Sequence, residues 1–529
     1  MQNALTRHTD DTPTVYADRV GEWYALQTSD SHKTEHGQYL TPQAVARFMA
    51  GMFCFHDPVV RVLDPGAGSG ILSCAASEVL AEMHGVRRIE LVAYETETGL
   101  VKLLEDVLHN LKLRLLRRGV ELAYEIRRDD FIMANSACIG TPQLPLFKNN
   151  VETFDCIISN PPYFKIPKAD PRAVAAAHVV HGQPNIYALF MAVSAYLLRP
   201  GGQLVFITPR SFAAGPYFHR FRECFFEIMR PETVHLFGSR TEAFDRDAVL
   251  QEHVILKGIR DDGWASSDAR HTVTVSYSAG VKDIDRPRHR TVPMPEVIDM
   301  MSHNKFLHIP ISDEEQAIIH LVNSWNGCLH AYDLEISTGP VVPFRATQFI
   351  TSENSDDTVP LLWMQNVKPM VTTWPVVTRK QQYIIANDQS RCLLVPNRNY
   401  VLLRRFSAKE EHRRLTAAPY VAVEFNNFEL IGLENHLNYI YRPKGNLTRD
   451  EAFGIAALLN CRLLDVYFRS FNGNTQVSAT ELRSIPLPPL EMSRKIGSEA
   501  QLKGLSAEAL DAWISDMLSN PGGEHGENS

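Results

Sequence analysis

The sequence predicts an α/β fold in which a doubly wound, mostly parallel sheet is followed by a C-terminal α+β domain. From about residue 36 to residue 258, short apolar runs alternate with segments of helical periodicity. Such alternation indicates a parallel sheet with helices on both faces. After about residue 260 the helical periodicity weakens, and short apolar pieces mix with Trp, Pro and Asn. We therefore expect a first domain at 1–262, a second at 263–495, and a polar, partly disordered tail at 496–529.

Five short apolar runs in the first domain are predicted to form the strands of this sheet. In chain order they are VVRVLD (59–64), RIELVAYE (88–95), YEIRRDDF (124–131), FDCIISN (154–160) and QLVFITP (203–209). The helices expected between them are ILSCAASEVLAEM (71–83), TGLVKLLEDVLHNLKLRLLRRG (98–119) and NIYALFMAVSAYLL (185–198). Because ligands of such sheets bind at the carboxyl ends of the strands, residues at those ends are the candidates for a site.

Composition excludes several classes of protein. A chain of 529 residues with 44% hydrophobic content can bury a large core. Its eight cysteines form no CxxC pair, which argues against a zinc site or a disulfide framework, and we expect no metal. No apolar run reaches the roughly 20 residues that cross a bilayer. The first residues, MQNALTRHTDDT, lack the basic and apolar regions of a signal peptide. A soluble cytoplasmic protein is expected.

The charge pattern leaves the type of partner open. A net charge of −8 argues mildly against a polyanionic partner. A nucleic-acid cleft needs only a local basic lining, however, and the segment 398–449 contains many arginines. A solvated basic surface is an equally good interpretation of that segment.

A glycine-rich turn, DPGAGSG (64–70), follows the first predicted strand. Gly66, Gly68 and Gly70 allow the backbone to turn tightly and to approach a ligand closely. The spacing matches neither the phosphate loop, which ends in Lys-Ser or Lys-Thr, nor GxGxxG. The turn therefore disfavours ATP and NAD as ligands.

Acidic residues end the next two predicted strands. Glu95 ends the second, where a carboxylate can hold ribose hydroxyls. Asp130 ends the third, where a carboxylate can accept from an adenine amino group while the ring of Phe131 packs beside the base. Either carboxylate taken alone is more simply a solvated strand-end residue. Their order after the glycine-rich turn favours a nucleoside-bearing cofactor.

The turn Asn160-Pro161-Pro162-Tyr163 directly follows the fourth strand. Two prolines continue neither a strand nor a helix, so they predict a rigid turn. This turn presents two acceptors, the Asn160 amide oxygen and the Pro161 carbonyl, beside an aromatic face. Two acceptors suit the two hydrogens of an exocyclic amine, and Tyr163 can stack on the base. A purely structural turn is the alternative interpretation.

With these motifs in this order, the chain resembles the gamma-class, TaqI-like N6-adenine DNA methyltransferases of type II restriction–modification systems. The resemblance covers nearly the whole chain and implies a Rossmann-like fold that binds S-adenosylmethionine (SAM). GQYLTP (37–42) resembles the N-terminal SAM motif of the family, and ENHLNYIYRP together with 451–488 resembles its specificity domain.

The resemblance implies a role for each matching residue. Thr41 and Pro42 would contact the methionine end of SAM, Glu95 the ribose, and Asp130 with Phe131 the adenine. The full cofactor set is Tyr39, Thr41, Pro42, Asp64, Pro65, Gly66, Gly68, Glu95, Asp130, Phe131 and Pro162. The catalytic set is Asn160, Pro161, Pro162 and Tyr163, with Phe244 flanking the target base opposite Tyr163 and Phe237 as its alternative.

The implied function is methylation of N6 of an adenine that flips out of double-stranded DNA. The resemblance further implies a bacterial or archaeal cytoplasmic protein, a monomer, and a separate restriction endonuclease as its functional partner. No metal is needed, because the sulfonium is already activated.

Three alternatives stay open. The same turn occurs in methyltransferases that act on glutamine of proteins or on RNA. A non-catalytic DNA-specificity subunit would fail to bind SAM. A fused restriction–methylation enzyme would cleave DNA, but the SAM motif begins within the first 40 residues and leaves no room for a nuclease domain ahead of it.

Overall fold

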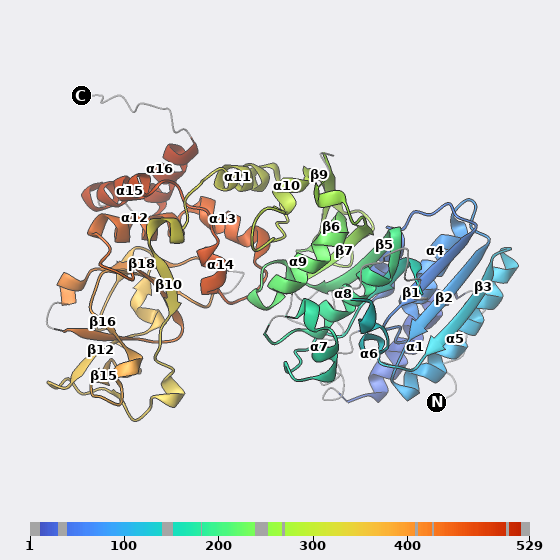
Figure 1. Cartoon of the computed structure of the whole chain (residues 1–529), viewed down its shortest axis with the longest axis horizontal. Coiled ribbons are helices and arrows are strands. Elements are labelled where there is room, and N and C mark those ends of the chain that lie inside the picture. The colour runs from blue at the N-terminus through green and yellow to red at the C-terminus, as the bar shows by residue number, and fades with distance from the viewer. Residues whose placement is uncertain are drawn as a thin grey trace. The chain divides into compact units, whose positions relative to one another are not determined.

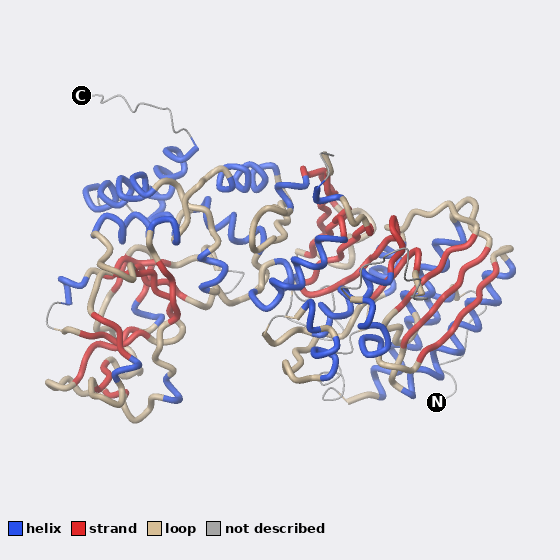
Figure 2. Tube along the Cα trace, viewed as in Figure 1, coloured by secondary structure: helices blue, strands red, loops and turns tan. Residues whose placement is uncertain are grey.

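The chain forms two compact units in a computed structural model, residues Met1–Ile311 and Ser312–Ser529. The structure describes residues 11–29, 40–139, 152–180, 182–238, 252–266, 270–407, 411–425, 428–503 and 507–519. Figure 1 labels the helices and strands, and Figure 2 separates helices, strands and loops by colour.

Unit 1 is built on one large sheet of nine described strands, in the order β3-β2-β1-β4-β5-β7-β6-β8-β9. The strands are β1 (Val59–Asp64), β2 (Arg88–Tyr94), β3 (Glu121–Arg127), β4 (Phe154–Ser159), β5 (Leu198–Pro209), β6 (Met229–Phe237), β7 (His253–Arg260), β8 (Thr272–Ser278) and β9 (Arg288–Pro293). Strands β1 to β5 are parallel, as predicted. Beyond β5 the sheet is mixed, since β7 runs antiparallel to both β5 and β6.

Helices cover both faces of this sheet (Figure 1). They are α1 (Pro13–Gln27), α3 (Gln43–Ala50), α4 (Ile71–Glu82), α5 (Thr98–Arg117), α6 (Phe131–Asn135), α7 (Pro171–Ala175), α8 (Ile186–Leu197), α9 (His219–Ile228) and α10 (Met294–Val297). Successive strand residues point to opposite faces. Val62 of β1 accordingly packs in the cluster with α1, α3, α4 and α5, whereas Leu63 packs in the cluster with α8 and α9. The predicted doubly wound arrangement is confirmed.

The first unit extends further than the sequence predicted. Its boundary lies after Ile311 rather than after residue 262, because β8 and β9 continue the first sheet. Strand β8 pairs in parallel with β6, and β9 pairs antiparallel with β8. Strand β8 is one of the short apolar segments from which the sequence predicts the second domain at 263–495. Its pairing partner lies about 40 residues earlier in the chain, so local periodicity does not reveal where the strand belongs.

Unit 2 is α+β, as expected. Its four-stranded sheet has the order β10 (Glu335–Thr338), β20 (Leu437–Tyr441), β17 (Tyr400–Arg404), β18 (Ala417–Tyr420). A five-stranded sheet has the order β11 (Ile350–Thr351), β15 (Tyr383–Ile385), β12 (Thr358–Leu362), β19 (Leu430–Leu433), β16 (Leu394–Pro396), and β13 (Val367–Lys368) pairs with β14 (Val371–Thr372). Its helices are α11 (Asp313–Asn323), α12 (Arg449–Asn460), α13 (Arg462–Phe471), α14 (Ala479–Arg483), α15 (Leu490–Lys503) and α16 (Ala507–Ser519).

The predicted tail at 496–529 is largely helical as far as the structure describes it, since α15 and α16 occupy residues 490–503 and 507–519. Ile496 and Ile514 are fully buried, because α15 packs against α12 and α16 packs against α12 and α13 within unit 2. Among the described residues, no helix is both long and apolar enough to cross a membrane.

Candidate active site

Three sequence-predicted residues come together at one edge of the sheet of unit 1. Asp64 ends β1, Glu95 follows β2, and Asn160 follows β4. Because β2, β1 and β4 are adjacent and parallel, their carboxyl ends meet at this edge. The strand order therefore brings the glycine-rich turn, the first acid and the Asn-Pro-Pro turn into one neighbourhood.

The carboxylate of Asp64 holds the glycine-rich turn in place. It is fully buried and accepts a hydrogen bond from the Ser73 hydroxyl (2.7 Å) and one from the Gly66 amide (3.4 Å). Burial raises the pKa of Asp64 to about 7. Ser73 belongs to α4, so Asp64 ties the turn to the helix that follows it. This enclosed position gives Asp64 a structural part in forming the glycine-rich loop.

Gly68 and Gly70 of this turn meet different structural requirements. Gly68 and Gly70 have positive φ angles of 56° and 83°, a conformation that favours glycine. A Cβ on Gly70 would lie 2.7 Å from the Leu104 Cδ1 atom, so close packing against α5 also requires glycine there. A Cβ on Gly68 would meet none of the described residues within 4 Å. Gly68 is thus where the described part of the chain leaves space beside the loop backbone for a ligand.

Glu95 lies against this open part of the loop. Its Oε2 atom accepts a hydrogen bond from the Gly68 amide at 2.8 Å, and its Oε1 atom accepts one from the Glu97 amide at 2.8 Å. Burial raises the pKa of the Glu95 carboxyl. A carboxylate has about four acceptor positions, so two backbone bonds leave capacity for ribose hydroxyls.

Asp130 and Phe131 occupy the start of α6. Asp130 caps this short helix by accepting from the Met133 amide at 3.0 Å, and its Oδ2 atom lies 3.9 Å from Nη1 of Arg172. Phe131 is only 3% exposed, and its ring centroid lies 5.2 Å from those of Tyr94 and Phe190. Most of the Phe131 ring is therefore packed in the hydrophobic core. The sequence did not predict that the guanidinium group of Arg172 lies beside the Asp130 carboxylate.

The Asn160 amide is held from two sides. Its Nδ2 atom donates to the Thr41 hydroxyl at 3.0 Å, and its Oδ1 atom accepts a short hydrogen bond from the Tyr163 hydroxyl. The Tyr163 hydroxyl also lies 3.0 Å from the carbonyl oxygen of Ile207 in β5. Pro161 is buried and Pro162 is half-buried. The double-proline turn is thus fixed to the sheet through Tyr163.

The Tyr163 ring is enclosed. It is 7% exposed, its centroid lies 5.4 Å from that of His253, and it meets Tyr187 edge-on at 6.1 Å. Neither His253 nor Tyr187 was predicted as a site residue. Tyr187 lies in the first turn of α8, and its hydroxyl shares a hydrogen bond of 2.6 Å with the Ser211 hydroxyl.

Known proteins identify the family to which this chain belongs. Residues 86–244 match the family described as Eco57I restriction-modification methylase. The chain is 32% identical to the type II methyltransferase M.PstI of Providencia stuartii, over 95% of this chain and 97% of that protein. It is also 32% identical to the type II methyltransferase M.BsuBI of Bacillus subtilis, over 93% of this chain and 96% of that protein. The chain belongs to the type II restriction–modification methyltransferases. It is accordingly a DNA methyltransferase.

Solved structures resemble this methyltransferase at low sequence identity. A DrdV–DNA complex, determined by cryo-electron microscopy, aligns with 92% of this chain at 12% identity and a TM-score of 0.48. The alignment spans 59% of the DrdV chain.

Three aromatic candidates of the methyltransferase have two different outcomes. Tyr39 and Phe244 both lie outside the described residues. Phe237, the alternative to Phe244, ends β6 fully buried, with its ring centroid 4.8 Å from that of His235. In this structure the Phe237 ring is enclosed by the core and offers no face for a base.

A buried ion pair joins the end of β5 to the residue before β7 in the methyltransferase. Arg210, which follows β5, is 3.1 Å from the carboxylate of Glu252, which precedes β7. Both side chains are almost completely buried, and the backbone amide of Arg210 donates to the Glu252 carbonyl at 2.7 Å. The sequence analysis did not predict this pair, because it joins positions 42 residues apart.

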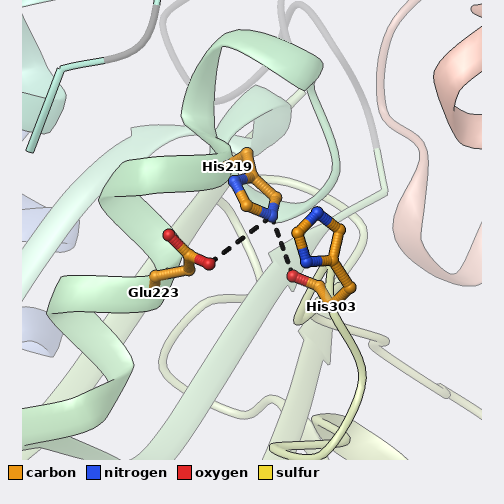
Figure 3. Close-up of side chains that lie close together, drawn as sticks. All are labelled: His219, Glu223 and His303. Atoms are coloured by element: carbon orange, nitrogen blue, oxygen red, sulfur yellow. Dashed lines mark hydrogen bonds and ion pairs between the residues drawn. The ribbon is translucent and has the colours of Figure 1, made fainter.

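A histidine–glutamate cluster lies on α9 of the methyltransferase (Figure 3). His219 and Glu223 approach His303, with possible ligand atoms within 4.8 Å of one another. The His219 Nε2 atom is already 2.8 Å from the His303 carbonyl oxygen, and Arg220 lies 3.1 Å from the Glu223 carboxylate. A cation beside the carboxylate opposes binding of a second cation. We therefore interpret the cluster as a link between α9 and the segment around His303.

Proposed function

We propose that this DNA methyltransferase transfers a methyl group from SAM to N6 of an adenine that has flipped out of double-stranded DNA. The observation that carries the proposal is the Asn160-Pro161-Pro162-Tyr163 turn, fixed at the end of β4 beside the glycine-rich loop on β1. A fixed turn with two acceptors beside an aromatic ring suits an exocyclic amine on a planar base.

The cofactor loop fits SAM. The open space at Gly68 admits a ligand close to the backbone, and the Glu95 carboxylate beside it can accept from ribose hydroxyls. We assign the adenine end to Asp130 and Phe131, and the methionine end to Tyr39, Thr41 and Pro42. Pro65, Gly66 and Pro162 complete the set, with Asp64 behind the loop. When bound, SAM supplies an activated methyl group on a positively charged sulfur.

Asn160 and Pro161 hold the target amine. The Asn160 Oδ1 atom and the Pro161 carbonyl each accept one hydrogen from N6, which draws the nitrogen lone pair out of conjugation with the ring. The lone pair is then available for bond formation, and the surplus proton is lost to water. In the structure the Tyr163 hydroxyl already donates to Oδ1, but an amide oxygen has two lone pairs and can accept a second hydrogen.

Base flipping brings the adenine to this turn, because N6 is not accessible to methyl transfer inside the stack. We propose that Tyr163 stacks on the flipped base and that Phe244 flanks its other face. At 7% exposure, the Tyr163 ring has to be uncovered before a base can stack on it. DNA binding is therefore expected to rearrange the surroundings of Tyr163.

Unit 2 is proposed to be the target-recognition domain, with Arg and Lys side chains on DNA phosphates and binding that weakens steeply as salt rises. The protein would act as a monomer in the cytoplasm of a bacterium or archaeon. Methylation would protect host DNA from a separate restriction endonuclease that recognises the same sequence.

The test is transfer of labelled methyl from SAM to genomic DNA, followed by nucleoside analysis of the product. We expect N6-methyladenine with the native chain and none with Asn160→Ala, which should bind SAM normally. Label in another base would overturn adenine as the target. Label in protein or RNA but not in DNA would favour another acceptor.

A further inference from the structure

Lys380 is an exposed residue of unit 2, in the segment between β14 and β15. Its ammonium nitrogen lies 4.2 Å from the centroid of the Trp363 ring. A cation over the face of a tryptophan ring is attracted by the negative charge density of that face. Because the lysine side chain is long and flexible, this contact restricts where its ammonium group lies. Lys380 therefore presents its charge at a defined position on the surface of unit 2.

Trp363 also holds the backbone beside Lys380. Its indole Nε1 atom donates to the Gln381 carbonyl oxygen at 2.7 Å, and the Leu361 amide donates to the Gln382 carbonyl oxygen at 2.9 Å. Trp363 directly follows β12 and is only 6% exposed, so the packed interior restricts its ring. Both the ammonium group and the chain that carries it are therefore held by the same buried ring.

A buried carboxylate adds a second constraint on the lysine. Glu434 lies between β19 and β20, is fully buried, and donates its amide to the Leu362 carbonyl oxygen, next to Trp363, at 3.0 Å. Its Oε1 atom lies 2.5 Å from the His436 Nδ1 atom. Burial raises the pKa of the Glu434 carboxyl, and the nearby His436 and Lys380 oppose this rise. Since a buried charge requires a partner, Glu434 serves as the counter-charge of this cluster.

The turn that carries Glu434 is itself fixed. The Asn435 amide donates to the Val341 carbonyl oxygen at 2.8 Å, and the Arg405 Nη1 atom donates to the Asn435 carbonyl oxygen at 3.0 Å. Two segments that are distant in the sequence thus hold this turn from outside. The position of Lys380 is consequently set by the sheets of unit 2, through Trp363 on one strand end and Glu434 on the next.

The local charge balance distinguishes two uses of such a cation on DNA. Attraction of phosphates needs positive charge and no fixed direction. Beside Glu434 the charge of Lys380 is partly balanced, so the cluster adds little to this attraction. A base edge needs a donor at a fixed position, and an ammonium group has three donors and no acceptor. In the major groove, guanine presents two acceptors, O6 and N7, to such a donor.

We propose that Lys380 recognises a guanine of the target sequence in the major groove. This inference rests on the proposed function of unit 2 as the target-recognition domain. The ammonium group donates to O6 and N7 of the guanine, while Trp363 and Glu434 hold it in place. Adenine at the same position would put the N6 amino group where O6 lies, so that a donor would meet a donor.

The test compares the sequences methylated by the native chain and by Lys380→Met, both at full length. Methionine keeps an unbranched, flexible side chain but has no charge and no donor. Each protein methylates genomic DNA, and sequencing that detects modified bases then gives the recognised motif. The native motif should require guanine at one position, and discrimination there should fall by a factor on the order of 10 to 100 in Lys380→Met. The other positions should keep their preferences.

Two further variants separate position from charge. Lys495 is an exposed lysine of α15, so Lys495→Met removes the same charge from unit 2 and should leave the motif unchanged. Glu434→Gln keeps the shape of the side chain but removes the counter-charge of Lys380. It should relax the same position as Lys380→Met. Equal relaxation in Lys495→Met would show that net charge, and not the position of Lys380, sets the preference.

An unchanged motif in Lys380→Met would overturn the inference. This holds whether DNA binding is weakened, as for a phosphate contact, or equal to that of the native chain. Acetylation of lysines in the full chain, with and without methylatable DNA, tests the role of unit 2 separately. If DNA protected no lysine of unit 2, the proposed recognition domain would fail. If other lysines of unit 2 were protected and the motif of Lys380→Met were unchanged, only the assignment of Lys380 would fail.

Discussion

Glu95 combines two tasks at the scale of a single residue. Its carboxylate holds the glycine-rich loop through the Gly68 amide, and it is the residue proposed to accept from the ribose of SAM. Burial raises its carboxyl pKa, yet both oxygens accept backbone N–H groups, and hydrogen bonds of this kind favour the charged form. Loss of the side chain should therefore affect cofactor binding in two ways at once.

Glu95→Ala should weaken SAM binding about 10- to 100-fold, since hydrogen bonds to a charged group contribute about 1.5–3 kcal/mol. Isothermal calorimetry with SAM measures the effect. Glu125→Ala is the matched control, because Glu125 on the neighbouring strand β3 is an exposed carboxylate that pairs with Arg127. Equal SAM affinities for Glu95→Ala and Glu125→Ala would contradict the assignment of Glu95.

At the residue scale, the sequence predicted which residues gather but not how they are packed. Asp64, Glu95 and Asn160 could be placed together because strand-end positions follow from strand order. The burial of Phe131 and Tyr163 could not be predicted, because it depends on residues that are distant in the sequence. Phe131 packs against the Phe190 ring, and the Tyr163 hydroxyl contacts the Ile207 carbonyl. The same reason hides Thr41 as a partner of Asn160.

At the scale of elements, the early strands were predictable and the late ones were not. Strand β1 was predicted at 59–64 and occupies those residues, and β4 ends one residue before the predicted 160. Both are short, largely apolar runs that are mostly buried, and such runs can be recognised from the local sequence. Strand β6 carries Pro231 and an irregular register beside it, and β8 alternates polar with apolar residues. The positions of β6 and β8 in the sheet are set by pairing with strands that are distant in the sequence. Local periodicity carries no information about such pairing.

His235 is a buried link between β6 and β8. Its ring nitrogens lie 2.9 Å from the Ser276 hydroxyl and 3.1 Å from the Ser278 hydroxyl, both on β8. Burial lowers the pKa of His235 to about 4. A neutral imidazole, with one donor and one acceptor nitrogen, matches two hydroxyl groups.

This link should weaken in acid. The unfolded chain binds a proton on this histidine near its ordinary pKa of about 6.5, whereas the folded chain does so only near pH 4. The stabilising contribution is therefore full above about pH 6.5 and is lost as the pH falls toward 4, by an amount on the order of 3 kcal/mol. His308, whose pKa burial lowers to about 3, adds a similar loss.

Urea unfolding at pH 7, 6 and 5 checks this expectation. His235→Asn should lower stability at pH 7, and its free energy of unfolding should fall less steeply with acid than that of the native chain. His289→Asn, on the exposed side of β9, should follow the native pH profile. A His235→Asn profile parallel to the native one would show that the buried imidazole does not titrate as argued.

At the scale of the whole molecule, the position of the boundary between the two units decides which fragment of the chain should fold on its own. The structure places this boundary after Ile311, whereas the sequence predicted it after residue 262. A fragment of residues 1–262 ends just beyond β7 and lacks β8, so the edge of β6 that normally pairs with β8 would be left open. Val273 and Val292, fully buried residues of β8 and β9, would also be missing from the core. A fragment of residues 1–311 keeps the whole sheet and every described residue of the candidate site.

Residues 1–311 should therefore fold with a single cooperative transition and bind SAM as the full chain does, whereas residues 1–262 should aggregate or unfold at a lower temperature. Thermal unfolding followed by circular dichroism, with SAM calorimetry, compares the two fragments. The 1–311 fragment should lose sequence-specific binding to methylatable DNA, because unit 2 is the proposed reader of the sequence. If it bound and methylated the same sites as the full chain, target recognition would have to reside in unit 1, and unit 2 would need another role.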